Sequence, residues 1–248
     1  MGTVVLSSIS TKAPKGFDKE KTKAKTEKLL EELDELQNLL IAESKYSLLV
    51  VIQGMDASGK DGALKNVFGS LNPLGVSATS WKAPTPEELG HDFLWRIHKE
   101  APRKGMIKIF NRSHYEDILI TRVHQWCDDG TAQKRIKAIN DFEQLLETHN
   151  HTKILKFYLH ISPKEQQERL QERVHDPRKM WKYNENDFAE AKLWKHYMKY
   201  YEEAINKCNK ISWTVVPSDQ NWYKEYVIAQ KTVETLRALR MQYPGLKK

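Results

Sequence analysis

The sequence predicts one α/β domain in which a parallel β-sheet is flanked by helices. Short, continuous apolar runs alternate with helical patterns along the chain. Continuous hydrophobicity is typical of strands covered on both faces, as in a parallel sheet, and strands that alternate with helices imply right-handed crossovers. The 248 residues contain no internal repeat and no low-complexity linker, so we expect them to form one domain.

The composition excludes several classes of protein and suggests one kind of partner. Hydrophobic residues make up 40% and charged residues 29%, which excludes a mostly disordered chain. Cys127 and Cys208 form neither a disulfide framework nor a zinc pattern, so a cytoplasmic location fits best. We expect neither membrane insertion nor export, because no apolar run approaches about 20 residues and the N-terminus lacks a signal-peptide core. The net charge of +7 indicates a polyanionic partner.

The first 45 residues are expected to form an arm and a long helix. Residues 1–16 have no periodicity and predict a loose arm. A helix follows, because leucines recur at three- and four-residue spacing at positions 29, 30, 33, 36, 39 and 40. These leucines pack either on their own domain or on another subunit, so a homo-oligomer stays open. The lysine-rich stretch 19–28 is either a solvated helix face or a guide for a polyanion.

The remaining elements follow in order. The predicted strands are residues 47–53, 76–81 (a weaker pattern), 106–110, 154–161 and 213–216. Two helices begin with a hydroxyl cap followed by proline and glutamate, at Thr85–Glu88 and Ser162–Glu165. Amphipathic patterns predict further helices around residues 136–146 and 227–239.

The most specific motif follows the first strand. Residues 54–60 match G-x-x-x-x-G-K, and the apolar face of a helix comes directly after them. The glycines let backbone N–H groups surround phosphate oxygens, while the helix N-terminus and Lys60 add positive charge. The alternative is a glycine-rich turn that binds nothing. We expect phosphate to be bound by Gly54, Ala57, Ser58, Gly59, Lys60, Asp61 and Lys65.

This motif departs from the usual pattern in two places. Asp61 and Gly62 stand where a Ser or Thr would normally hold Mg²⁺, and Asp56 places a carboxylate inside the loop. Because Asp56 would repel phosphate unless a divalent cation lay between them, we predict that metal ligation has moved to Asp56. The alternative is that Asp56 stabilises the loop as an Asx turn.

Two further segments carry suitable chemistry. After the strand ending at Phe110, Arg112, Glu116 and Asp117 supply a cation and metal ligands at the edge where ligands bind. Alternatively, the two acids only favour a helix N-terminus capped by Ser113, and His114 packs. Residues 165–195 are expected to form a cationic lid, with Pro177 ending one helix and Asp187 starting the next. A solvated basic surface is the alternative.

Together these segments resemble the polyphosphate kinase 2 family, a branch of the P-loop kinases similar in fold to thymidylate kinase. The resemblance spans about residues 15–240, and its motifs are residues 54–62, 81–89, 110–117, 176–182 and 215–223. The form of residues 114–117 resembles class III, whose members are taken to phosphorylate nucleoside mono- and diphosphates. The resemblance implies a P-loop kinase fold over residues 1–248, with a helical lid and an N-terminal helical extension.

The family reaction implied for this chain is reversible phosphoryl transfer between inorganic polyphosphate and AMP, ADP or ATP. ATP synthesis is the favoured direction, Mg²⁺ or Mn²⁺ is the cofactor, and guanine nucleotides are further candidates. Neither a membrane nor nucleic acid is expected as a partner. One alternative is an ATP-dependent nucleoside monophosphate kinase, which the same loop and lid would serve. A catalytically idle nucleic-acid-binding domain is a weaker alternative, because Trp194, Tyr197, Tyr200 and Tyr201 have the helical spacing of core residues.

The resemblance also implies roles for single residues. The expected catalytic residues are Asp56, Lys60, Arg112 and Asp117, and those expected to act from the lid on phosphate are Arg173, Arg178, Lys179 and Lys182. The nucleotide-binding residues implied are Lys82, Arg112, Glu116 and Arg122, although Lys82 is equally compatible with polyphosphate. The implied metal ligands are Asp56, Asn111, Glu116 and Asp117. Many relatives have Asp at the position of Asn111, which shifts weight onto Asp56.

Overall fold

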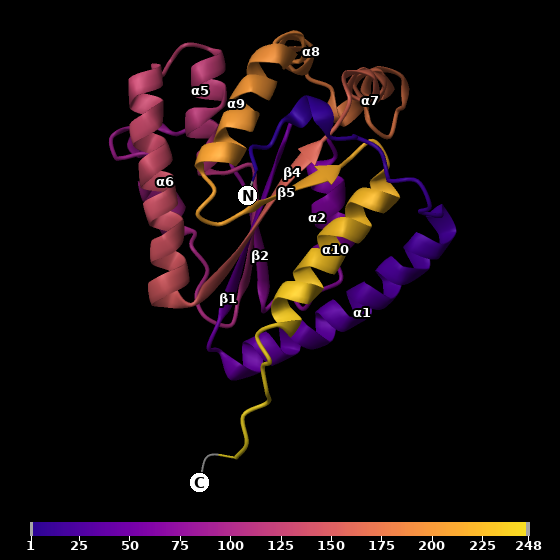
Figure 1. Cartoon of the computed structure of the whole chain (residues 1–248), viewed down its shortest axis with the longest axis vertical. Helices are drawn as coiled ribbons and strands as arrows, with labels where there is room; N and C mark the ends of the chain where they lie inside the picture. Colours follow the sequence, from indigo (N-terminus) through magenta and orange to yellow (C-terminus); the bar gives the residue numbers. More distant parts are fainter. Residues whose placement is uncertain (1, 247–248) are drawn as a thin grey trace.

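Five parallel strands form the centre of the computed structural model, which describes residues 2–246 (Figure 1). The strand order is β2-β3-β1-β4-β5. Val50 of β1 pairs with Ile109 of β3 on one side and with Leu155 of β4 on the other. The predicted parallel sheet is therefore confirmed. The strands are β1 (Ser47–Gly54), β2 (Val76–Ser80), β3 (Ile107–Asn111), β4 (Thr152–His160) and β5 (Trp213–Pro217).

Helices connect the strands and cover both faces of the sheet. The longer α-helices are α1 (Lys19–Glu43), α2 (Lys60–Phe68), α6 (Asp129–Asn150), α7 (Pro163–His175), α8 (Glu185–Lys192), α9 (Trp194–Lys207) and α10 (Asn221–Arg237). The short ones are α3 (Pro86–Leu89), α4 (Trp95–Lys99) and α5 (Ile120–Val123), and the 3-10 turns are η1 (Leu6–Ser8), η2 (His114–Ile118) and η3 (Met180–Lys182).

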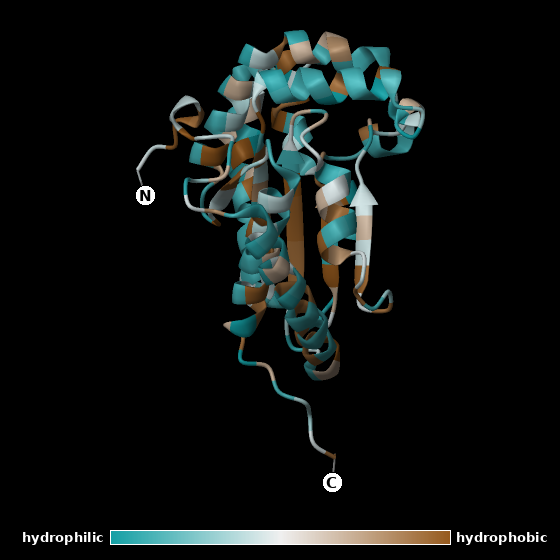
Figure 2. Ribbon diagram, turned by 90° about the vertical axis from the view of Figure 1, so that its right-hand side faces the viewer, coloured by the Kyte–Doolittle hydropathy of each residue, from teal (hydrophilic) through white to brown (hydrophobic). Residues whose placement is uncertain are grey.

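Two apolar cores lie on the two faces of the sheet. Helices α1, α2 and α10 pack on one face, and α6, α9 and η2 pack on the other (Figure 1). In Figure 2 a central strand is strongly hydrophobic, as expected for a strand covered on both sides, whereas a strand at the edge of the sheet is paler. Leu33 and Leu40 of α1 are fully buried in the same core as Ile228 and Val233 of α10. The leucine stripe therefore packs on its own domain, where each fully buried leucine contributes about 1.5–3 kcal/mol.

The N-terminal arm is docked, so the prediction of a loose arm is wrong for the described residues. The backbone N–H groups of Val4 and Leu6 donate to Asn206 Oδ1 and Glu202 Oε2, both at 2.8 Å. The Leu6 side chain is 2% exposed. These partners lie about 200 positions away in the sequence, so no local pattern signals the contact.

Two helix boundaries also differ from the prediction. Helix α8 begins at Glu185 with Asn184 as its cap, and the proposed start residue Asp187 instead forms an ion pair with Arg173. Helix α10 begins at Asn221 rather than near residue 227. Side-chain pairing and packing override the local start signals in these two segments. The predicted helix start at Thr85 is confirmed, because its capping box with Glu88 is present and begins the short helix α3.

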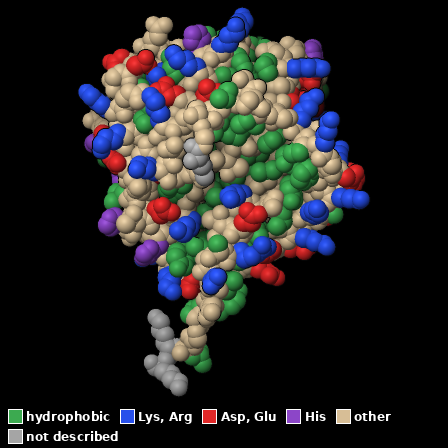
Figure 3. Space-filling view, viewed as in Figure 1, with side chains coloured by type: hydrophobic (Ala, Val, Ile, Leu, Met, Phe, Trp, Pro, Cys, Tyr) green, Lys and Arg blue, Asp and Glu red, His purple; other side chains and the backbone are tan. Residues whose placement is uncertain are grey.

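The outer surface carries charges of both signs. In Figure 3 lysines and arginines are spread around the rim of one face with acids among them, rather than gathered in one basic patch. In residues 2–246, no helix combines the length and the apolar character needed to cross a bilayer.

Candidate active site

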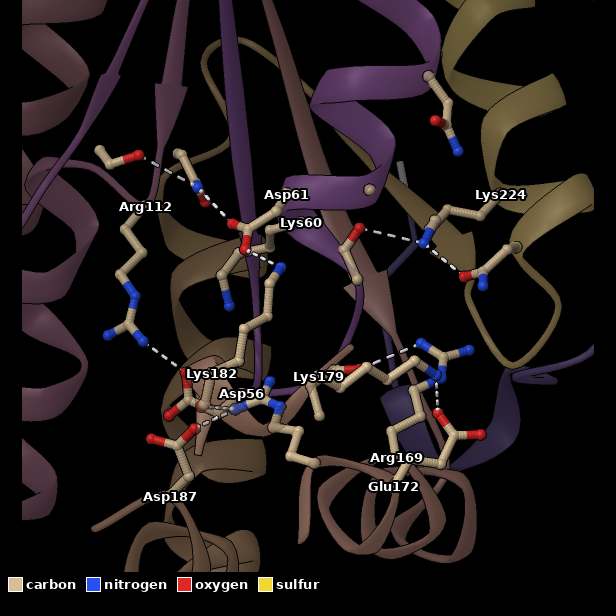
Figure 4. A pocket seen from close by; sticks show the side chains of 18 of the residues that line it. Asp56, Lys60, Asp61, Arg112, Arg169, Glu172, Lys179, Lys182, Asp187 and Lys224 are labelled. Atoms are coloured by element: carbon tan, nitrogen blue, oxygen red, sulfur yellow. Dashed lines mark hydrogen bonds and ion pairs between the residues drawn. The ribbon is translucent and has the colours of Figure 1, made fainter. Parts of the chain in front are cut away.

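A cavity of about 650 Å³ lies at the carboxyl ends of the strands, between the phosphate loop and the segment 163–192 (Figure 4). The phosphate loop, residues 54–60, leaves β1 where its neighbours are β3 and β4. Later strands add to opposite sides of β1, so the crossovers diverge there and leave a crevice. The fold therefore places the loop at the position where α/β sheets bind ligands.

The phosphate loop needs glycine at its two motif positions. Gly54 has a φ of 156°, and a Cβ there would lie 2.7 Å from the Ser58 Oγ. Gly59 has a φ of 90°, and a Cβ there would lie 2.3 Å from the Lys224 Nζ. Both positions thus combine a backbone conformation that disfavours side chains with a close neighbour. Helix α2 starts directly after Gly59 without a side-chain cap, which leaves N–H groups of its first turn available to an anion.

Lys60 is buried beneath the phosphate loop and forms hydrogen bonds to the backbone of the loop. The Lys60 ammonium donates to the carbonyl oxygens of Gly54 at 2.7 Å and Met55 at 3.0 Å. Burial, with a further contribution from Arg112, lowers the pKa of Lys60 to about 8, although Asp56 opposes this shift. The side chain is therefore a cation at neutral pH that lacks a full counter-charge. A phosphate group would supply that charge.

Side chains from α7 and α10 hold the other carbonyl oxygens of the loop. Gln166 donates to the Asp56 carbonyl at 3.0 Å, Arg169 to that of Ala57 at 3.1 Å, and Lys224 to that of Gly59 at 3.1 Å. These three hydrogen bonds connect the phosphate loop to α7 and α10. Figure 4 shows Lys224 and Arg169 on the opposite side of the loop from Arg112. Cations therefore flank the loop on both sides.

Lys224 is a cavity residue that the sequence-based reasoning missed. Its side chain is fully buried, and burial, reinforced by Arg169, lowers its pKa to about 8. Asn221 accepts a second hydrogen bond from its ammonium at 2.8 Å. The sequence carries no local signal for this role, because a lysine near the start of a helix is ordinarily exposed and only the structure shows that Lys224 is buried.

Arg112 lies at the end of β3 in a left-handed backbone conformation with a φ of 64°. This conformation costs a non-glycine residue about 1–2 kcal/mol, and such strain is concentrated at functional sites. Its N–H still donates to the Ile52 carbonyl at 3.0 Å, so the ladder with β1 holds the strained residue in place. The guanidinium forms an ion pair with Asp56. Burial opposes the charge, but Asp56 and Glu116 raise the pKa of Arg112 above its ordinary value.

The predicted metal ligands are divided between the cavity and the layer behind it. Asp56 and Asn111 line the cavity, whereas Glu116 and Asp117 do not. Burial raises the pKa of Glu116, opposed by Arg112, and raises the pKa of Asp117 to about 6, opposed by Arg135. Within residues 2–246, no group of three His, Cys, Asp or Glu side chains is placed to hold a metal ion. The carboxylates of Asp56, Glu116 and Asp117 therefore do not meet at one point in the described residues.

The cavity nevertheless offers oxygen atoms suited to a hard divalent cation. The Asn111 Oδ1 is buried and has no hydrogen-bond partner among the residues that the structure describes, while its amide nitrogen donates to the Asp61 Oδ1 at 2.9 Å. The Asp56 and Asp61 carboxylates line the same space. Carboxylate and amide oxygens, completed by phosphate oxygens and water, are the ligand set that Mg²⁺ prefers. The residues present therefore fit such a cation.

The segment from α7 to α8 covers the cavity with cations that already have partners. Arg173 pairs with Asp187, and Lys179 pairs with Glu172. The Lys182 Nζ lies 2.9 Å from the Asp61 Oδ2, which joins this segment to the phosphate loop. Arg178 pairs with Asp176 and lies outside the cavity, with 89% of its side chain exposed. An incoming polyanion would have to exchange with these carboxylates.

Arg122 lies away from the cavity in a structural role. Its side chain is buried, and it donates to Asp129 at 2.6 Å and to Glu203 at 2.7 Å. Its guanidinium also lies 4.1 Å from the centre of the Tyr200 ring. These contacts tie α5 to α6 and α9. The prediction that Arg122 binds nucleotide therefore has no support in the geometry.

The placement of the other predicted residues can be stated briefly. The predicted residues that line the cavity are Asp56, Ala57, Gly59, Lys60, Asp61, Asn111, Arg112, Arg173, Lys179 and Lys182. Those that do not line it are Gly54, Ser58, Lys65, Lys82, Glu116, Asp117, Arg122 and Arg178. Lining residues without a predicted site role include Ser80, Trp81, Glu165, Arg169, Glu172, Trp181, Asp187, Asn221, Lys224 and Glu225.

Comparison with known proteins gives consistent matches along the chain. The model of the family described as Polyphosphate kinase 2 matches residues 16–244. An AMP/ADP-polyphosphate phosphotransferase of Meiothermus ruber is 47% identical over 214 residues, which cover 86% of this chain and 80% of that protein. An ADP-polyphosphate phosphotransferase of Rhodopseudomonas palustris is 38% identical, covering 87% and 79%. The crystal structure of polyphosphate kinase 2 from Arthrobacter aurescens TC1 superposes with a TM-score of 0.96 at 40% identity, covering 100% of this chain and 90% of that one.

Proposed function

The chain belongs to the polyphosphate kinase 2 family, and we propose that it transfers a terminal phosphoryl group reversibly between inorganic polyphosphate and the nucleotides AMP and ADP. The observation that carries the proposal is the flanking of one phosphate loop by cations on both sides, Arg112 on one and Lys224 with Arg169 on the other. This arrangement suits two phosphate compounds that meet end to end at the loop. In-line transfer requires that alignment.

The proposed reaction needs little covalent chemistry from the protein. A phosphate oxygen of the nucleotide attacks the terminal phosphorus of the polymer, and the bond from that phosphorus to the bridging oxygen breaks. The shortened polyphosphate keeps the bonding electron pair. Since the attacking oxygen is already ionised near neutral pH, positioning and charge stabilisation account for most of the catalysis.

The cavity residues divide into roles under this proposal. Lys60 and the loop amides hold the transferring phosphate, and Arg112 stabilises the charge that develops on it. Lys224 and Arg169 extend the cationic surface on the other side of the loop. Lys182 adds a positive charge from the predicted lid. The whole chain acts as one kinase-like domain, with residues 1–45 as an extension and about 165–195 as a lid.

A divalent cation, Mg²⁺ or Mn²⁺, completes the proposed site. Asp56 and Asn111 would hold it, with Asp61 nearby and Glu116 and Asp117 behind. When bound, the cation neutralises phosphate charge. The Asp56 carboxylate would then be shared between the cation and Arg112, which couples the metal to the arginine that contacts the transferring group.

The remaining predictions of partners and location stay proposals. Lys82, which follows the cavity residue Trp81, stays a proposed contact of either nucleotide or polyphosphate, whereas Arg122 is left out because its partners lie within the fold. Acceptance of guanine nucleotides is consistent with a cavity that is lined mainly by charged side chains. A cytoplasmic location accords with the two free cysteines. A homo-oligomer likewise stays a proposal.

The test is a comparison of phosphoryl donors. Purified protein is incubated with AMP or ADP, Mg²⁺ and either polyphosphate or ATP, and products are separated by ion-exchange chromatography. We expect ADP and ATP to form with polyphosphate. Phosphorylation of AMP by ATP, with none by polyphosphate, would contradict the proposal and identify an ATP-dependent nucleoside monophosphate kinase.

A further inference from the structure

A buried ion pair lies behind the active site, outside the cavity. The Lys156 Nζ of β4 lies 2.6 Å from the Glu143 Oε2 of α6, and both side chains are 0% exposed. Burying two charges is costly, and apolar residues of similar size often stabilise a fold equally well. A contribution to the stability of the fold therefore does not explain why the chain has this ion pair.

The pair holds one residue of the strand-end segment. The Tyr115 hydroxyl donates to the Glu143 Oε1 at 2.6 Å and accepts from Lys156 at 2.9 Å. Lys156 also donates to the Cys208 carbonyl at 2.9 Å, at the end of α9. The position and orientation of the Tyr115 side chain are thus held by groups from β4 and α6.

Tyr115 lies in the middle of the segment that the active site uses. Arg112 precedes it, and Glu116 and Asp117 follow it within the single turn η2. The ring is fully buried and meets Trp213 edge-on at 4.6 Å. One turn of 3-10 helix has few hydrogen bonds of its own, so its position depends on such an anchor.

We propose that Glu143 and Lys156 are positioning residues, which act through Tyr115 to set the locations of Arg112 and Glu116. This inference rests on the proposed function. A misplacement of about 1 Å at a reacting centre can lower turnover about 100-fold. Because the pair touches neither the phosphate loop nor the lid, polyphosphate binding stays nearly normal when it is removed.

The test removes both charges together, so that neither is left buried without its partner. The double variant Glu143→Leu/Lys156→Met removes both, and Tyr115→Phe removes only the hydroxyl. Thermal unfolding confirms that each variant is folded at the assay temperature. We expect kcat to fall at least tenfold in the double variant and several-fold in Tyr115→Phe, with the KM for polyphosphate within twofold of wild type.

The same two elements provide a matched control. Lys153 of β4 and Glu147 of α6 form an exposed pair at 3.6 Å, and Glu147→Leu/Lys153→Met is expected to leave kcat unchanged. The inference would be overturned if Glu143→Leu/Lys156→Met or Tyr115→Phe folds and keeps the wild-type kcat. It would also be overturned if these variants change only the KM for polyphosphate. Tyr115→Phe decides the matter if the double variant does not fold. Absence of polyphosphate-dependent transfer in the wild type would instead contradict the proposed function.

Discussion

Replacement of Lys60 by methionine should stabilise the fold and abolish most of the activity. Lys60 has a pKa of about 8 instead of 10.5, because it is buried among loop carbonyls with Arg112 nearby. The corresponding free energy is about 3 kcal/mol. Below about pH 8 the Lys60 ammonium is charged in both the folded and the unfolded state, and this free energy destabilises the folded state in full. The destabilisation disappears as the pH rises from about 8 to 10.5.

The net effect on stability is smaller than this cost. Lys60→Met also leaves the Gly54 and Met55 carbonyl groups without their donor, at about 1 kcal/mol each. A net stabilisation of about 1–2 kcal/mol remains, which raises the Tm of a chain of this size by about 2–8 °C. Loss of one preorganised cation that faces the transferring phosphate lowers kcat by about 100- to 1,000-fold.

Two measurements check this prediction. Scanning calorimetry at pH 7 gives the Tm, and ATP formation from ADP and polyphosphate gives kcat. In the wild type, kcat/KM should fall as the pH rises above about 8, because a deprotonated Lys60 no longer attracts phosphate. A variant with near-normal kcat would refute the assignment of the loop. A variant whose Tm falls together with its activity would refute the argument from the buried charge.

Three further substitutions test neighbouring parts of the site. Lys224→Met should raise the KM for polyphosphate about 10- to 100-fold, the equivalent of one charge-assisted contact, and change the nucleotide KM less; equal effects on both would contradict a specific role of Lys224 in polyphosphate binding. Gly59→Ala places a Cβ 2.3 Å from the Lys224 Nζ at a φ of 90°, so thermal unfolding should show a lower Tm and the assay a higher polyphosphate KM. Arg122→Met should lower the Tm, because it removes the partly buried hydrogen bond to Glu203 and the contact with the Tyr200 ring, while leaving the nucleotide KM unchanged; a raised KM at constant Tm would restore Arg122 to the nucleotide site.

Much of the fold could be predicted because its signals are local. A continuous apolar run such as residues 47–53 marks a strand covered on both sides wherever its neighbours lie in the chain. The leucine spacing in α1 likewise defines an apolar face, although only the structure showed that α10 covers it. The order of the strands and the docking of residues 4–13 depend on contacts between distant segments, and neither has a local signature.

The active site shows the same division between local and distant information. The sequence by itself determined the phosphate loop and the strand-end segment around Arg112, because backbone conformation and side-chain type there are set within a few residues. The tertiary structure alone decided which groups surround them. Lys224 reaches Gly59 across 165 positions, Arg169 reaches Ala57 across 112, and Arg122 is turned away by acids on α6 and α9. The residues of a motif determine its backbone conformation. The charged side chains that surround the motif come from distant segments, and the packing of the two cores decides which segments these are.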